Sequence, residues 1–209
     1  MKLRHDALYA SRRSPVLAAQ AGLRMLLAGG NAADAALASA IALTVLEPTG
    51  NGLGSDAYAI IWDGKELHGL NASGRAPAAW SPERFAGADA MPQRGWESVT
   101  VPGAVSAWRE ISDKFGKLPF EKLFEPAIEY ASRGFAVSPI IATLWEKGGN
   151  LLGKQPGFAE AFLPGGKAPK AGELFINRAI AESLTDIAET GGESFYRGRL
   201  AAKNAAFAK

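Results

Sequence analysis

The stretch AGGNAADAA, residues 28–36, marks the end of one helix and the start of the next. Asn31 is a favoured N-cap residue, and Asp34 lies in the first turn, where the helix dipole stabilises a negative charge. Large apolar residues then recur at helical spacing: Leu37, Ile41 and Val45. Alanines surround this stripe, so the stretch predicts a central, largely buried helix that ends before Pro48.

A first helix is predicted before this stretch. It follows the cap signal Ser14-Pro15 and ends at the pair Gly29-Gly30. Apolar residues at helical spacing predict one buried stripe on it: Val16, Ala19, Leu23, Leu26 and Leu27.

A β-hairpin is predicted after the central helix. Residues 57–62 form a short apolar run rich in β-favouring side chains, Asp63-Gly64 is a turn signal, and residues 66–72 can return as the partner strand. The glycine cluster at residues 50–54 follows a helix and opens a strand, which is the reverse of the order in a dinucleotide-binding loop. We therefore expect tightly packed backbone there, where a side chain would collide.

The remainder of the chain is predicted to be mainly helical. Residues 76–97 are rich in proline and glycine and predict a loop with one helical turn capped by Ser81. Two helices are predicted next, from Pro102 to Gly116 and from Pro119 to Gly134. Residues 148–172 contain seven glycines and are predicted to form a long surface loop. A last helical pair is expected at residues 178–189 and 193–208.

Composition excludes several classes of protein. The 209 residues are 47% hydrophobic and 21% charged, which is typical of a folded domain. The net charge is only +2 and the basic residues are scattered, so nucleic acid is not an expected partner. The absence of cysteine excludes disulfides, thiolate nucleophiles and cysteine-ligated zinc. Neither a signal peptide nor a membrane span is recognisable, so a soluble, cytoplasmic protein without a membrane partner is expected.

These residues contain no recognisable set of catalytic groups that could act without another chain. The only histidines are His5 and His68, and His68 lies on a predicted strand without an acidic or histidine neighbour at metal-ligand spacing. Glu125 and Glu129 have helical i, i+4 spacing, which an exposed acidic face explains better than an acid–base pair. We therefore expect no catalytic residue, no metal site and no cofactor.

A series of motifs in fixed order resembles the gamma-glutamyltranspeptidase family. The motifs lie along nearly the whole chain: AAQAG (18–22), AGGNAADAA (28–36), LEP (46–48), GLG (52–54), NASGRAP (71–77), VTVPGA (99–104), PAI (126–128), GF (134–135) and FYRG (195–198). The helix start at residues 28–36 and the turn at residues 99–104 are together highly specific.

This resemblance implies a fold and a mechanism. Members of the family are N-terminal-nucleophile hydrolases with a four-layer αββα sandwich, which is an α/β (α+β) fold. Each precursor cuts itself into a large and a small subunit, and the new N-terminal threonine is the nucleophile. Residues 1–209 are expected to be a single, helix-rich partial domain, the front portion of the large subunit. The sequence contains no Thr-Thr-His-type processing motif that would supply this threonine. The expected partners are therefore the remaining large-subunit segment and the small subunit.

The resemblance also assigns substrate-binding residues. In the classical transpeptidases, an arginine and a glutamate occupy the positions of Ser73 and Gly74, and the arginine binds the α-carboxylate of the glutamyl donor. Here Arg75 comes two residues later, where strand alternation would keep it on the same face, about 6 to 7 Å further along. Ser73 and Arg75 are therefore the candidate substrate-binding residues. A salt bridge at the end of the sheet is the alternative role for Arg75.

The Ser-Gly-Arg-Ala-Pro form resembles acylases and glutamyltransferase-like hydrolases of the wider family. It implies hydrolysis or transfer of γ-glutamyl or related acyl amides, with a small-molecule substrate and a nucleophile outside this chain. The alternative is a truncated relative that serves as a non-catalytic scaffold or binding domain.

Overall fold

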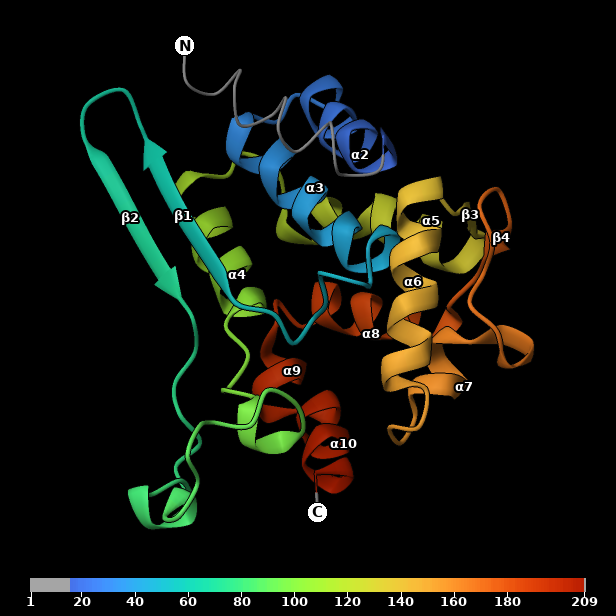
Figure 1. Cartoon of the computed structure of the whole chain (residues 1–209). Helices are drawn as coiled ribbons and strands as arrows, with labels where there is room; N and C mark the ends of the chain where they lie inside the picture. Colours follow the sequence, from blue (N-terminus) through green and yellow to red (C-terminus); the bar gives the residue numbers. More distant parts are fainter. Residues whose placement is uncertain (1–15, 209) are drawn as a thin grey trace.

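The computed structural model describes residues 16–208, and the helices outnumber the strands (Figure 1). The elements follow one another in this order: α2 (Val16–Leu27), α3 (Ala32–Leu46), β1 (Ala57–Trp62), β2 (Leu67–Ala72), η1 (Pro82–Phe85), η2 (Trp96–Ser98), α4 (Ala104–Phe115), η3 (Phe120–Phe124), α5 (Glu125–Arg133), β3 (Phe135–Ala136), α6 (Pro139–Leu152), α7 (Phe158–Phe162), η4 (Pro164–Gly166), β4 (Leu174–Phe175), α8 (Arg178–Glu189), α9 (Glu193–Arg197) and α10 (Arg199–Phe207). The sheets formed by these residues are two antiparallel pairs, β1–β2 and β3–β4.

The central helix α3 begins as predicted, with a reciprocal cap. The Asn31 side-chain oxygen accepts hydrogen bonds from the backbone N–H groups of Ala33 and Asp34 at 3.0 and 3.1 Å. In return, the Asp34 carboxylate accepts from the Asn31 N–H at 2.8 Å, which completes a capping box. The predicted stripe is buried: Leu37, Ile41 and Val45. The helix ends at Leu46, as expected from Pro48.

Helix α2 is present, but its predicted buried face is wrong. Val16 is 72% exposed and Leu27 is 79% exposed, while the buried residues are small or unbranched: Ala18, Ala21, Gly22 and Met25. A Cβ atom at Gly22 would lie 2.6 Å from the Ser39 Oγ atom, so the glycine lets the two helices approach closely. Close packing with α3 thus decides which face of α2 is buried. The predicted cap at residues 14–15 lies outside the described residues.

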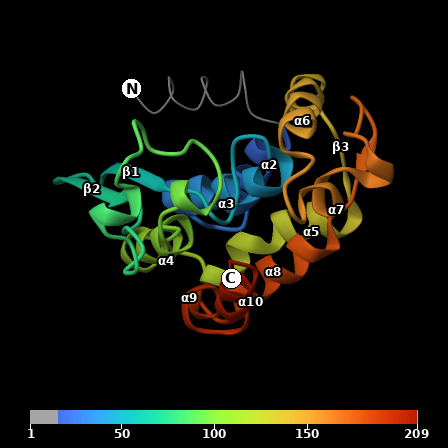
Figure 2. The ribbon, with the colours of Figure 1, turned by 60° about the horizontal axis from the view of Figure 1, so that its bottom comes forward.

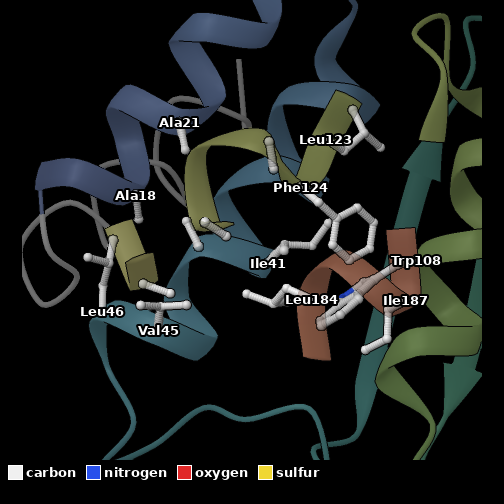
Figure 3. Packing of buried hydrophobic residues seen from close by; sticks show 14 of the residues in the cluster. Ala18, Ala21, Ile41, Val45, Leu46, Trp108, Leu123, Phe124, Leu184 and Ile187 are labelled. Atoms are coloured by element: carbon white, nitrogen blue, oxygen red, sulfur yellow. The ribbon is translucent and has the colours of Figure 1, made fainter. Parts of the chain in front are cut away.

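One hydrophobic cluster joins α3 to the helices around it (Figure 3). Figure 3 shows Ile41 of α3 close to Trp108, Phe124, Leu184 and Ile187, which come from α4, η3 and α8. Each fully buried side chain of this size contributes about 1.5–3 kcal/mol through removal from water. The core therefore fixes the helices against which the hairpin and the later turns pack.

The predicted hairpin is confirmed, and its two faces differ. Strand β1 pairs with β2 from Ala57↔Ala72 to Trp62↔Leu67, with residues 63–66 as the connecting loop. One face packs against the core through half-buried side chains, including Ile61. The other carries exposed apolar side chains, including Ile60, which is 79% exposed. In Figure 1 the hairpin lies beside α3 and α4.

The later helices confirm most of the expected pattern, but several boundaries differ. Helices α4 and α8 and the turn η1 occupy the predicted regions, while the helix predicted from Pro119 to Gly134 is divided into the 3-10 helix η3 and the α-helix α5. Helix α6 extends through Gly148 and Gly149 to Leu152, into the region predicted to be a surface loop. The glycine at 149 packs against Leu163, since a Cβ there would lie 3.0 Å from the Leu163 Cδ2 atom. The last predicted helix is divided at Gly198 into α9 and α10, which lie next to α8 in Figure 2.

The expected tight packing of residues 50–54 is not found among residues 16–208. A Cβ at Gly52 would meet its nearest atom at 3.9 Å, and one at Gly54 would meet no atom within 4 Å. These glycines therefore have open space around them and make no close backbone contact that would exclude a side chain. Within the described residues, no helix has both the length and the apolar character needed to cross a bilayer.

Candidate functional site

Residues 73–75 leave the hairpin in an irregular conformation. Strand β2 ends at Ala72, the Ser73 N–H donates to the Asn71 Oδ1 atom at 3.1 Å, and Gly74 has a φ of 78°. Only glycine adopts this left-handed conformation without strain. Strand alternation therefore does not place Arg75 relative to Ser73, and that part of the sequence prediction is wrong.

The segment 99–103 lies alongside residues 73–75 (Figure 1). The Val101 N–H donates to the Arg75 carbonyl oxygen at 2.9 Å, and the Thr100 hydroxyl donates to the Ser73 carbonyl oxygen at 3.0 Å. A Cβ atom at Gly74 would overlap the carbonyl oxygen of Val101. The close backbone contact expected at residues 50–54 is thus found here instead.

Tyr196 of α9 holds the other side of this turn. Its hydroxyl donates to the Pro102 carbonyl oxygen and accepts from the Ser106 N–H, both at 2.9 Å. Three motifs far apart in the sequence, at residues 71–77, 99–104 and 195–198, therefore meet at one place. The sequence identifies each motif but not their contact, because the hydrogen bonds that join the motifs link residues 27 to 94 positions apart.

These segments surround an open hollow of about 470 Å³. The residues that line it are Asn71, Ala72, Ser73, Gly74, Arg75, Val101, Pro102, Gly103, Ser106 and Tyr196. Both candidate substrate-binding residues, Ser73 and Arg75, belong to it. Arg75 is exposed and takes part in none of the ion pairs formed among residues 16–208, so the alternative role in a salt bridge is not found there. A guanidinium group in this position is able to bind a carboxylate through two parallel hydrogen bonds.

His68 has acidic neighbours, contrary to the sequence expectation. Its Nε2 atom lies 2.9 Å from the Asp63 Oδ2 atom and 3.6 Å from the Glu66 Oε1 atom. Hydrogen bonds from the Glu66 N–H, the His68 imidazole and the Lys65 N–H, in that order of size, hold the pKa of Asp63 well below its usual range. The three ligand atoms lie within 4.8 Å of one another, as a metal site would require. Because both Asp63 oxygens already accept hydrogen bonds within the hairpin loop, the arrangement is explained as a turn-stabilising network.

The carboxylates of α5 are held in ion pairs. Glu125 pairs with Lys122 at 3.3 Å, and Glu129 pairs with both Arg24 and Arg133 at 2.8 and 3.2 Å. These contacts favour the structural interpretation of the pair over an acid–base role.

Comparison with known proteins places this geometry in a family. The model of the Gamma-glutamyltranspeptidase family matches residues 18–209, nearly the whole chain. The chain belongs to the gamma-glutamyltranspeptidase family. The resemblance inferred from the ordered motifs is thereby confirmed.

Relatives in this family differ in the substrates that their names state. The chain is 40% identical over 188 residues to the glutathione hydrolase-like YwrD proenzyme of Bacillus subtilis, covering 88% of this chain and 36% of that protein. It matches the crystal structure of cephalosporin acylase from Bacillus halodurans with a TM-score of 0.86 and 47% identity, over 91% of this chain and 37% of the acylase. The Helicobacter pylori gamma-glutamyltranspeptidase structure matches with a TM-score of 0.85 and 28% identity, over 90% of this chain and 56% of that one.

The chain spans little more than a third of the length of the first two relatives, and it matches part of the cephalosporin acylase structure. Its helix-rich fold with few short strands is therefore a portion of the fold of this family.

Proposed function

We propose that this chain is the front part of the large subunit of an amidohydrolase that hydrolyses or transfers γ-glutamyl or related acyl amides. The observation that carries the proposal is the hollow at residues 73–75, where three family motifs meet around the exposed Arg75. An N-terminal threonine outside this chain would supply the nucleophile, with its own α-amine as the base. The chain would then form one wall of the active site.

In this proposal, residues 1–209 are one partial domain of a four-layer αββα sandwich. The exposed apolar face of the hairpin supports this arrangement, because it includes large side chains that usually lie inside a protein: Tyr58, Ile60, Trp62 and Leu67. Strands of the remaining large-subunit segment and of the small subunit would cover that face. These two parts are the proposed polypeptide partners.

Arg75 would recognise a carboxylate on the substrate. Such a contact, made by an exposed guanidinium through two parallel hydrogen bonds to one carboxylate, contributes about 1.5–3 kcal/mol in total. Ser73 contributes a neutral hydroxyl where the classical transpeptidases have the arginine. We therefore expect a broader range of acyl groups than in those enzymes, with Arg75 as the residue that retains a preference for acidic ones.

Two measurements test this function. A mass spectrum of the complete native protein should show a second chain that begins with threonine; a single unprocessed chain would favour the non-catalytic scaffold instead. In the processed enzyme, Arg75→Ala should lower kcat/KM for a γ-glutamyl anilide by about ten- to a hundredfold, following about 1.4 kcal/mol per decade.

The matched control is Arg133→Ala. Arg133 is an exposed arginine at the end of α5, and its ion pair with Glu129 is of the kind that contributes less than about 1 kcal/mol. Equal kinetics for the Arg75 and Arg133 variants would show that Arg75 does not contact the substrate.

A further inference from the structure

We propose that Tyr196 is a positioning residue for substrate recognition, which holds Arg75 in place through the turn at residues 99–103. The inference rests on the proposed function, in which Arg75 binds a carboxylate of the substrate. Tyr196 itself would act on the turn rather than on the reacting atoms.

The hydroxyl of Tyr196 joins two groups of the turn. It donates to the carbonyl oxygen of Pro102 and accepts from the N–H of Ser106, each at 2.9 Å. Ser106 lies in the first turn of α4, where a backbone N–H has no partner within the helix. The hydroxyl thus fixes the end of the turn to the start of the helix.

The turn is also joined to the backbone of Arg75. The residue before Pro102 is Val101, whose N–H donates to the Arg75 carbonyl oxygen at 2.9 Å. Gly74 packs so closely on the Val101 carbonyl oxygen that no Cβ would fit between them. A shift of the turn must therefore move the backbone of residues 74 and 75.

Tyr196 is attached to the core through its neighbours on α9. Ser194, on the same short helix α9, is buried, and its hydroxyl donates to the Asp186 carboxylate of α8 at 2.8 Å. Phe195 is also buried and belongs to the hydrophobic cluster. Because α8 is itself part of the core, these contacts fix the position of α9 and therefore of Tyr196, which holds the turn.

The test is Tyr196→Phe, which removes the hydroxyl and keeps the ring. In the processed enzyme we expect KM for a γ-glutamyl anilide to rise about three- to tenfold, the size expected from one or two neutral hydrogen bonds. The kcat value should change less than about twofold, because the nucleophile is not involved. An acyl anilide without a carboxylate should be unaffected, because it does not use Arg75.

A double-mutant cycle with Arg75→Ala separates positioning from general stability. If Tyr196 acts through Arg75, its substitution should have little further effect on KM once the guanidinium is absent. Hydrogen exchange should also become faster at the Val101 and Ser106 amides in Tyr196→Phe. Additive effects on KM in the double variant would overturn the proposal.

The matched control is Tyr130→Phe, which removes a half-buried hydroxyl that donates to the Leu17 carbonyl oxygen at 3.2 Å, between α5 and α2. It should leave KM unchanged, and an equal rise in both variants would make Tyr196 merely structural. An Arg75→Ala variant with normal kinetics would overturn the proposed recognition of a carboxylate by Arg75, and the role of Tyr196 with it. A strong effect of Arg75→Ala with none from Tyr196→Phe would overturn this inference alone.

Discussion

Replacing Asp34 by alanine removes the acceptor of three backbone hydrogen bonds at the start of the central helix. The side chain is fully buried, and its carboxylate accepts from the Asn31 N–H at 2.8 Å. It also accepts from the N–H of Lys117 at 3.1 Å and from that of Leu118 at 3.3 Å. A single side chain therefore caps α3 and ties it to the loop that follows α4.

The expected loss of stability follows from the three backbone N–H donors that would lose their acceptor. A buried donor left without a partner costs about 1–3 kcal/mol, and the loss of an N-cap interaction costs about 1 kcal/mol. The loop at Lys117 and Leu118 is partly exposed, so water would replace part of those two bonds. We expect Asp34→Ala to lower the free energy of unfolding by about 3–5 kcal/mol, which for a chain of this size lowers Tm by roughly 6–20 °C.

The assay is urea unfolding followed by tryptophan fluorescence, with the slope m required to stay constant. Asp34→Asn should recover part of the loss, because one oxygen remains as an acceptor. The control is Asp113→Ala, which breaks an exposed i, i+4 pair with Arg109 and should cost less than about 0.5 kcal/mol. If Asp34→Ala and Asp113→Ala unfold at the same urea concentration, the carboxylate does not stabilise the fold as argued.

Three further predictions concern stability. Gly74→Ala should destabilise by about 2 kcal/mol more than Gly64→Ala in urea unfolding, because both have positive φ but only Gly74 would overlap another backbone atom. Gly22→Ala should lower Tm, while Gly54→Ala, which has open space, should not. Asp63→Asn should lower the free energy of unfolding near neutral pH. Because the pKa of Asp63 is depressed in the folded state, the difference in stability between the wild type and this variant should shrink as pH falls below about 4.

The elements that could be predicted from the sequence carry their own start and stop signals. Helix α3 has Asn31 before it and Pro48 after it, and the hairpin has a turn signal between two β-favouring runs. The buried face of α2 could not be predicted in the same way. It depends on close contact with α3 at Gly22, which a count of large apolar residues does not detect.

Two residues that line the candidate site could be named from the sequence, but the shape of the site could not. Ser73 and Arg75 were identified through the family motif, and both line the hollow. Their relative placement depends on the left-handed Gly74, and the role of Tyr196 depends on contacts across about ninety residues. Neither feature has a local signature, because turn conformation and long-range hydrogen bonds arise from packing.

The way residues 73–75 are held separates substrate recognition from chemistry in the proposed enzyme. Asn71, Thr100 and Val101 each make a hydrogen bond to this segment, and all of them belong to this chain. The proposed recognition surface is therefore held by residues of this chain and does not require the nucleophile. In the proposed enzyme, processing of the precursor would require the threonine but not a substrate carboxylate, so an Arg75→Ala precursor should still be cleaved while its KM for acidic substrates rises. Failure of that precursor to mature would mean that Arg75 supports the folding or processing of the complete enzyme rather than recognition.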